Sequence, residues 1–166
     1  MTTVNFKGNP VHLLGTPPSV GQTMPDFTLV KSDLSTVSLN DFADKEVLLN
    51  IYPSVDTGTC FKAVQHFDKL AAERPDLAVV CISMDLPFAS ARVAGNESFT
   101  HVMFLSDFRD HSFGKATGLI MKDGPLAGLF ARTVIILDKD HKVKYIQLVS
   151  EITEGPDYKK AEEFFN

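Results

Sequence analysis

The chain has 166 residues, of which 44% are hydrophobic and 22% are charged, and its formal net charge is −5. These proportions are those of a globular protein that buries a core, and they exclude a disordered or fibrous chain. The acidic balance, without any cluster of Lys and Arg, excludes nucleic acid and an anionic membrane as expected partners.

Other broad classes are excluded by what the sequence lacks. No apolar run approaches the roughly 20 residues that cross a bilayer, and the first residues have no signal-peptide pattern. Two cysteines are too few for a disulfide framework, so we expect a cytoplasmic protein. The five histidines have no metal-binding spacing, so we expect neither a metal nor a cofactor. No repeat or linker appears, which predicts one domain over residues 1–166.

The N-terminal half begins with two alternating segments around a Lys-Gly-Asn-Pro turn, a pattern that predicts a β-hairpin. A loop rich in Pro and Gly follows. The next segments predict strands, one capped turn and a helix that stops before Pro75. In order, the expected elements are a hairpin at 3–6 and 10–13, a loop at 16–25, a strand at 27–30, a turn at 38–42, a strand at 47–52 and a helix at 58–72.

In the C-terminal half, a continuous apolar run predicts a central strand that is covered on both faces. Pro87 can open a short helix, and Pro156 can open a terminal one. The expected elements are a strand at 77–83, a helix at 87–93, a strand at 102–105, a helical piece at 109–117, a hairpin at 129–137 and 142–149, and a terminal helix from 156. Strands that alternate with helices predict the α/β class, with a mixed sheet covered by helices.

The most informative stretch is Pro53-Ser54-Val55-Asp56-Thr57-Gly58-Thr59-Cys60. It joins a strand to a helix, so Cys60 is expected in the first helical turn. The unsatisfied N–H groups there carry partial positive charge, which favours a thiolate. Asp56 or Thr57 can cap this helix, and the Thr57 hydroxyl can lie close to the sulfur. The spacing fits equally well a buried cysteine that only fills the core.

Arg132 interrupts the apolar segment 129–137, which otherwise predicts a buried strand. A buried guanidinium needs an anionic partner or a route to solvent. Its side chain either reaches solvent at the exposed end of the strand, or faces Cys60 and binds the substrate. The residue pattern alone slightly favours the first interpretation.

Pro53, Thr57 and Cys60 form the pattern Pro-x-x-x-Thr-x-x-Cys, which resembles the active-site signature of the peroxiredoxins. The full eight-residue string resembles the bacterial thiol peroxidase branch of that family in particular. The likeness covers nearly the whole chain, through segments 3–11, 81–89, 123–132 and 147–153.

This resemblance implies a thioredoxin-like fold with an added N-terminal β-hairpin, and a thiol-dependent peroxidase. In such an enzyme a thiolate attacks a peroxide oxygen and becomes a sulfenic acid. The resemblance makes Cys60 the nucleophile, with Thr57 and Arg132 orienting the peroxide and stabilising charge. Pro53 would shape the pocket and shield the sulfur from water.

The partners expected from the resemblance are hydrogen peroxide, thioredoxin or another thiol reductant, and a second copy of the chain in a homodimer. An apolar pocket expected around Phe88 and Phe130 would admit alkyl hydroperoxides as well.

The chain departs from this branch at two positions. Ala94 stands where the branch places its resolving cysteine, so the usual internal disulfide cannot form, whether Ala94 is native or engineered. Gln65 stands where the branch commonly has Arg. Cys81, inside the apolar run 77–83, is expected to be an inert core thiol.

Two other functions compete with a peroxidase. A Cys60 sulfenate that persists could act as a redox sensor by forming a mixed disulfide with a protein partner. A thioredoxin-type disulfide oxidoreductase is disfavoured because Ala63 occupies the second position of a Cys-x-x-Cys motif.

Overall fold

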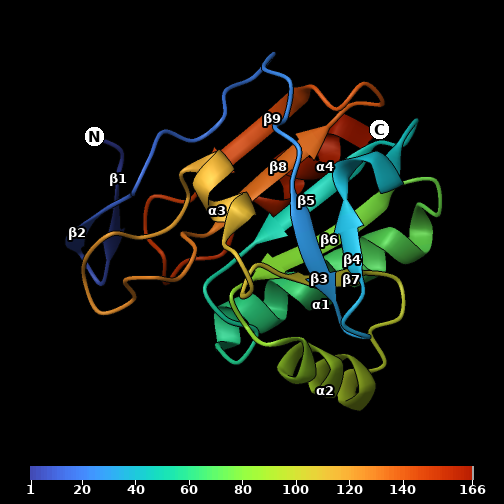
Figure 1. Cartoon of the computed structure of the whole chain (residues 1–166), viewed down its shortest axis with the longest axis horizontal. Helices are drawn as coiled ribbons and strands as arrows, with labels where there is room; N and C mark the ends of the chain where they lie inside the picture. Colours follow the sequence, from blue (N-terminus) through green and yellow to red (C-terminus); the bar gives the residue numbers. More distant parts are fainter. Residues whose placement is uncertain (166) are drawn as a thin grey trace.

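The computed structural model describes residues 1–165, and its main feature is a seven-stranded mixed sheet (Figure 1). The strand order is β4-β3-β7-β6-β5-β8-β9. The pairs β5–β6 and β6–β7 are parallel, and the other pairs are antiparallel. The strands are β3 (Thr28–Lys31), β4 (Thr36–Ser38), β5 (Val47–Ile51), β6 (Ala78–Ser83), β7 (Met103–Ser106), β8 (Thr133–Leu137) and β9 (Val143–Leu148).

The central strands are buried on both faces, as their continuous apolar sequences predict. Every residue of β5 is buried. Because side chains alternate along a strand, Leu48 packs into the hydrophobic cluster on one face and Leu49 into the cluster on the other. The end of β5 therefore starts the loop to Cys60 from a rigid position.

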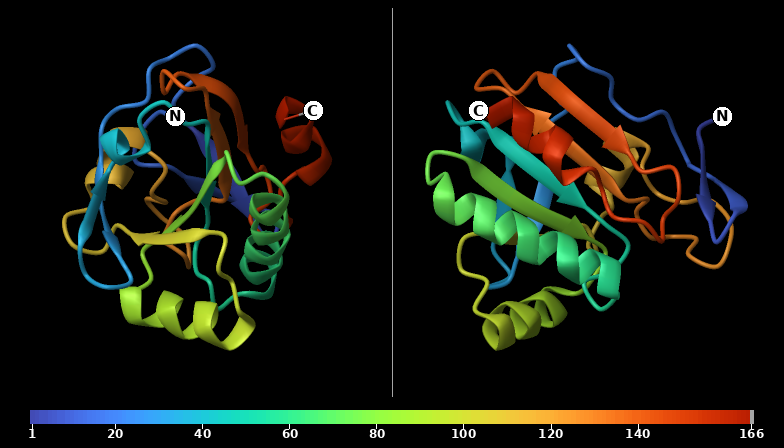
Figure 2. Two further views of the ribbon diagram at one scale, coloured as in Figure 1. Left: turned by 90° about the vertical axis from the view of Figure 1, so that its right-hand side faces the viewer. Right: turned by 180° about the vertical axis from the view of Figure 1, so that it is seen from behind.

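Helices cover both faces of this sheet, so the α/β class is confirmed (Figure 2). α1 (Gly58–Glu73) and α4 (Tyr158–Glu162) lie on one face, and α3 (Ser112–Thr117) lies on the other. α2 (Pro87–Glu97) contacts β7, and the short 3-10 helices are η1 (Leu39–Phe42) and η2 (Glu163–Phe165). α1 packs through a helical stripe of buried side chains, at Val64, Phe67, Leu70 and Ala71.

The predicted N-terminal hairpin is present as β1 (Thr3–Phe6) and β2 (Asn9–His12). Lys7 and Gly8 in its turn both have positive φ, 51° and 80°, as the turn that suits a two-residue hairpin requires. The hairpin is bound to the segment that follows β9, since Asn5 N donates to Ser150 O at 2.7 Å. This attachment brings the hairpin beside the loop at residues 150–153.

Several element boundaries differ from the sequence prediction; for example, the helix expected at 109–117 begins at Ser112. The strand expected at 129–137 begins only at Thr133, because the residues before it bond elsewhere: Leu129 O accepts from Met121 N and Ala131 N donates to Leu119 O, each at 2.9 Å. α2 extends to Glu97 and stops where Ser98 adopts the left-handed conformation. β4 was not predicted, since three residues are too few for an alternating pattern. Within residues 1–165, the helices are too short or too polar to cross a membrane.

Candidate active site

Cys60 lies in the first turn of α1, where the sequence places it, and its side chain is fully buried. Thr57 is the N-cap: its Oγ1 accepts from the Cys60 N–H at 3.4 Å and donates to the Ser54 carbonyl at 3.3 Å. Asp56, the alternative cap, instead pairs with Arg92 at 2.9 Å. The thiol therefore sits at the positive end of a capped helix.

Arg132 faces Cys60 and does not reach solvent at the end of the strand, so the first interpretation of this residue is wrong. Its Nη1 donates to Cys60 Sγ at 3.3 Å, and the residue is only 2% exposed. Arg132 immediately precedes β8, whose first residue, Thr133, pairs with Ile51 at the end of β5. This register places the guanidinium beside the start of α1, although 72 residues separate the two side chains in sequence.

The carbonyl oxygen of Ile152 was not predicted to take part, yet it orients Arg132. It accepts from Nε at 3.2 Å and from Nη2 at 2.9 Å. Glu151, beside it, accepts from Lys7 N at 2.9 Å and Gly8 N at 3.0 Å in the hairpin turn. Those hydrogen bonds, led by the one from Gly8, lower the pKa of Glu151 to about 2. The hairpin thus holds the segment whose carbonyl holds Arg132.

Asp85 is a second residue that sequence reasoning missed. Its carboxylate accepts from Ser54 Oγ and Val55 N, each at 2.8 Å, and from Ser83 Oγ at 2.7 Å. Its own carbonyl accepts from Ser106 Oγ at 2.5 Å. Asp85 therefore ties the Cys60 loop to the carboxyl ends of β6 and β7. An acidic residue two positions after a buried strand was the available signal.

A pocket of about 210 Å³ adjoins these residues. Pro53, Thr57 and Arg132 line the pocket, whereas Cys60 does not. Thr57 and Arg132, which bond to Cys60, therefore lie between the pocket and this residue. The remaining wall is mostly apolar and is formed by Phe6, Ser54, Thr59, Leu126, Leu129, Ile152 and Thr153.

The prediction that Phe88 and Phe130 line an apolar pocket is wrong, because neither residue lines the pocket beside Cys60. Phe88 is 62% exposed on α2, because it lies on the side of that helix that points away from the core. Phe130 is fully buried against Phe113, with ring centroids 5.7 Å apart. The apolar wall instead comes from the hairpin and from the segment before β8.

The second cysteine and the two residues that depart from the thiol peroxidase pattern lie on three different elements. Cys81 is in the middle of β6 and 1% exposed, and burial raises its pKa to about 12, while a hydrogen bond from Asn50 lowers it in part. Ala94 packs at the edge of the cluster beneath α2, and Gln65 is exposed on α1. Within residues 1–165, no group of three His, Cys, Asp or Glu side chains is placed to hold a metal ion.

A family model described as Redoxin matches residues 19–163. The chain is 44% identical, over 161 residues, to the thiol peroxidases of Mycobacterium bovis and Mycobacterium tuberculosis. These matches cover 97% of this chain and 96% of each relative.

Two solved structures are similar over 98% of this chain and 94% of theirs. A peroxiredoxin-like protein from Aquifex aeolicus has a TM-score of 0.92 at 37% identity. A thiol peroxidase from Chromobacterium violaceum has a TM-score of 0.90 at 22% identity, a likeness of fold alone. The thioredoxin-like fold is thereby confirmed, and the chain belongs to the thiol peroxidase branch of the peroxiredoxins.

Proposed function

We propose that this protein reduces hydrogen peroxide and alkyl hydroperoxides through a Cys60 thiolate, at the expense of an external thiol. The observation that carries the proposal is the contact of Arg132 Nη1 with Cys60 Sγ at 3.3 Å, at the edge of a pocket. A buried guanidinium so close to the sulfur can stabilise negative charge both on it and on a bound peroxide.

In the proposed reaction the thiolate sulfur attacks the terminal oxygen of the peroxide, and the O–O bond breaks. The sulfur keeps the OH group as a sulfenic acid, and the departing alkoxide or hydroxide takes a proton and leaves as alcohol or water. Negative charge moves from the sulfur to the leaving oxygen. Arg132 is the donor nearest that oxygen, and a donor of this kind can lower the barrier by about 3 kcal/mol. The Thr57 hydroxyl can add a second donor only if its proton turns from the Ser54 carbonyl to the peroxide.

The pocket supports both kinds of peroxide. Hydrogen peroxide needs only the polar end, where Thr57 and Arg132 lie. An alkyl group fits against Leu126, Leu129 and Ile152 on the apolar wall. Pro53 lines the same pocket and has no N–H to offer a competing water, so it keeps this side of the sulfur apolar.

Recycling of the sulfenic acid needs a thiol from outside this chain. The sequence contains two cysteines, and the second, Cys81, is buried inside β6. Ala94 offers no thiol on α2. Thioredoxin or another thiol is the proposed reductant.

Three further expectations from the sequence stay predictions. They are the homodimer, the cytoplasmic location and the single domain over residues 1–166.

The test is the mass of the protein after one equivalent of peroxide, stopped at millisecond intervals. Wild-type protein and Cys81→Ser are expected to gain one oxygen at the same rate, and Cys60→Ser to gain none. Cys81→Ser is the matched control, since it removes the other buried thiol. Equal oxidation of Cys60→Ser and wild type would refute the proposal. Ala94→Cys is expected to convert the sulfenate into an internal disulfide that thioredoxin reduces.

A redox sensor is the second candidate, favoured by the lack of any accessible second thiol in the sequence. A sulfenate on Cys60 would then last until a partner protein attacks it. Peroxide treatment of cells followed by non-reducing electrophoresis distinguishes the two functions. One dominant mixed disulfide with a single protein supports the sensor, and fast recycling by small thiols or thioredoxin supports the enzyme.

A further inference from the structure

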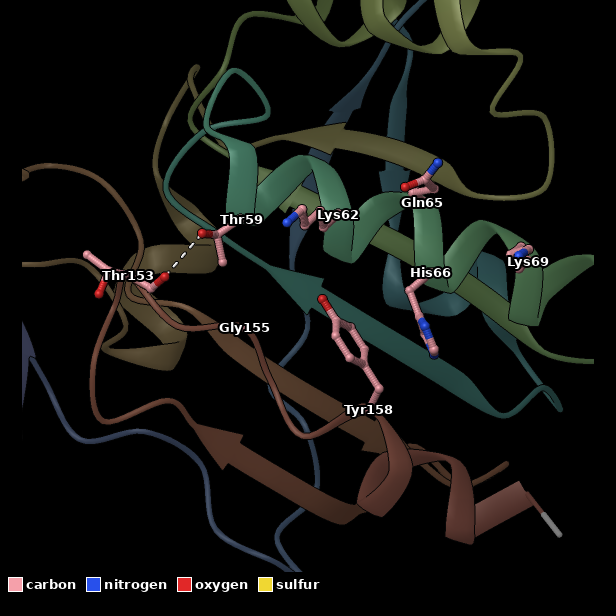
Figure 3. Close-up of a pocket in the computed structure, with 8 residues that line it drawn as sticks. All are labelled: Thr59, Lys62, Gln65, His66, Lys69, Thr153, Gly155 and Tyr158. Carbon is pink, nitrogen blue, oxygen red and sulfur yellow. Dashed lines mark hydrogen bonds between the residues drawn. The ribbon is translucent and has the colours of Figure 1, made fainter.

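A second, larger pocket of about 580 Å³ lies between α1 and the segment that leads into α4, and the proposed peroxidase chemistry leaves it unused (Figure 3). Side chains of α1 form one wall, and Tyr158 extends from α4 with its hydroxyl toward that helix. The lining residues are Thr59, Lys62, Gln65, His66, Lys69, Thr153, Gly155 and Tyr158.

The lining is positively charged, although the chain as a whole carries a net charge of −5. Lys62 and Lys69 are exposed, and neither forms an ion pair with another residue in 1–165. None of the eight lining residues is acidic. His66 in the wall is itself paired with Glu162 of α4, with Nε2 and Oε1 2.5 Å apart. A pocket with two free ammonium groups and no carboxylate in its wall attracts anions.

This positive pocket adjoins the pocket beside Cys60. Both are lined by Thr59 and Thr153, which are joined by a hydrogen bond from Thr59 Oγ1 to the Thr153 carbonyl at 3.1 Å. Lys62 follows Thr59 by three residues, so one helical turn, about 5 Å, separates them along α1. The two pockets therefore meet at this pair of threonines.

We propose that the positive pocket binds the carboxylates of a low-molecular-weight thiol, whose sulfur reaches Cys60 over Thr59 and Thr153. The proposal rests on the proposed function and names the class of its reductant. The volume of about 580 Å³ suits a group the size of an amino acid or a dipeptide. The ammonium groups of Lys62 and Lys69 hold the carboxylates, and they raise the local concentration of thiol at a cysteine that has no internal partner.

The chemistry needs two molecules of the thiol. The first attacks the sulfenic sulfur of Cys60, so that an S–S bond forms and the hydroxyl leaves with a proton as water. The second attacks the sulfur of the bound thiol, which releases Cys60 and a small-molecule disulfide. Two thiols are oxidised, and the two electrons they supply reduce the sulfenate.

The experiment compares three thiols of similar size: 3-mercaptopropionate, 2-mercaptoethanol and cysteamine, which are anionic, neutral and cationic. Each reacts with the Cys60 sulfenate of wild type, Lys62→Glu, Lys69→Glu, the double variant and Lys139→Glu. Lys139 is exposed in the turn between β8 and β9, at the end of β8 away from Thr133, and is outside the positive pocket. Lys139→Glu is the control for the two single variants, because it changes the net charge by the same amount as either of them. Rates are compared across variants for one thiol at a time, so its intrinsic reactivity cancels.

For 3-mercaptopropionate, the double variant is expected to react about tenfold more slowly than wild type, because attraction becomes repulsion. The rate with 2-mercaptoethanol is expected to change less than about twofold, and the rate with cysteamine to rise. Succinate, which has carboxylates but no thiol, is expected to slow the 3-mercaptopropionate reaction of wild type and not that of the double variant.

Two results would overturn the proposal: an equal loss of rate with all three thiols, or an equal effect of Lys139→Glu on the anionic thiol. Formation of the sulfenate is measured first in every variant. If peroxide forms none in wild type, the proposed function itself fails. If the sulfenate forms and then reacts independently of thiol charge, only the present inference fails.

Discussion

The carbonyl oxygen of Ile152 accepts two hydrogen bonds from Arg132, through Nε at 3.2 Å and Nη2 at 2.9 Å. The guanidinium is therefore fixed in its plane and presents Nη1 to Cys60. Arg132 lies at the site as a rigid fork rather than as a mobile charge, and its position depends on the backbone of a distant loop.

Replacing Arg132 tests geometry against charge. Arg132→Met is expected to slow oxidation of Cys60 about 10²- to 10³-fold, because it removes the donor to sulfur and peroxide. Arg132→Lys keeps the charge but cannot bind Ile152 O through two nitrogens while reaching Sγ, so it is expected to recover only a small part of the rate. Quenched-flow mass spectrometry measures the rate in this chain, which has no tryptophan to report it. Full activity of Arg132→Lys would show that charge alone matters.

Asp85→Asn tests the anchor of the Cys60 loop. An amide has one acceptor oxygen in place of two, and its NH₂ faces donors, so at least one of three hydrogen bonds is lost. The free energy of unfolding is expected to fall by about 1–3 kcal/mol, and oxidation of Cys60 to slow. Asp56→Asn is the control in the same loop, since its pair with Arg92 is exposed and is worth less than about 1 kcal/mol. Equal effects of the two variants would contradict the assignment.

Glu151→Gln tests the attachment of the hairpin through pH. The pKa of Glu151 is about 2 in the folded protein, lowered by the hydrogen bonds from Gly8, Lys7 and Thr153. Its ordinary pKa is higher, so its contribution to stability is complete above that value and is lost as the pH falls toward 2. Wild type is expected to be more stable than Glu151→Gln at pH 7, and the difference is expected to shrink between about pH 5 and pH 2.

Urea titrations at several pH values measure this difference. Glu154→Gln is the matched control, because the side chain of Glu154 is exposed and accepts no hydrogen bond within residues 1–165. If wild type and Glu151→Gln differ in free energy of unfolding by the same amount at pH 7 and at pH 2.5, the ionised Glu151 carboxylate does not attach the hairpin as proposed.

Cys81→Ala tests the buried thiol at high pH. Burial raises the pKa of Cys81 to about 12, so the folded state keeps this proton while the unfolded chain loses it near the ordinary thiol value. Unfolding then becomes easier as the pH rises from about 9 toward 12. Wild type is expected to lose more stability than Cys81→Ala over that range, whereas their difference is constant between about pH 6 and pH 8. Parallel curves up to pH 11 would refute the raised pKa.

Much of the fold could be predicted because the strong signals are local. The continuous apolar runs that became β5 and β6, and the cap at Thr57 that begins α1, act within a few residues. The strand expected at 129–137 was begun too early, because residues such as Phe130 are buried against α3 and bridged to Ile120 rather than paired in the seven-stranded sheet. A short apolar run indicates that a segment is buried, but it does not show whether the segment pairs as a strand of the sheet.

The site was predicted only where side-chain chemistry and a family pattern coincide. Pro53, Thr57, Cys60 and Arg132 were named from the sequence, and the structure brings them to one place. The Ile152 carbonyl could not be found in the same way, because any residue supplies a carbonyl and only the fold aims it. The hydrogen bonds of Asp85 depend on the meeting of two parallel strand ends, which no local window contains.

The contact between Arg132 and Ile152 also sets an order of events during synthesis. Cys60 leaves the ribosome 72 residues before Arg132, and Ile152 follows Arg132 by a further 20. Until that last segment emerges and the earlier hairpin binds it, the thiol has no oriented guanidinium beside it. A growing chain therefore carries Cys60 through the synthesis of 72 and then 20 further residues before the fold can place an oriented guanidinium beside the thiol.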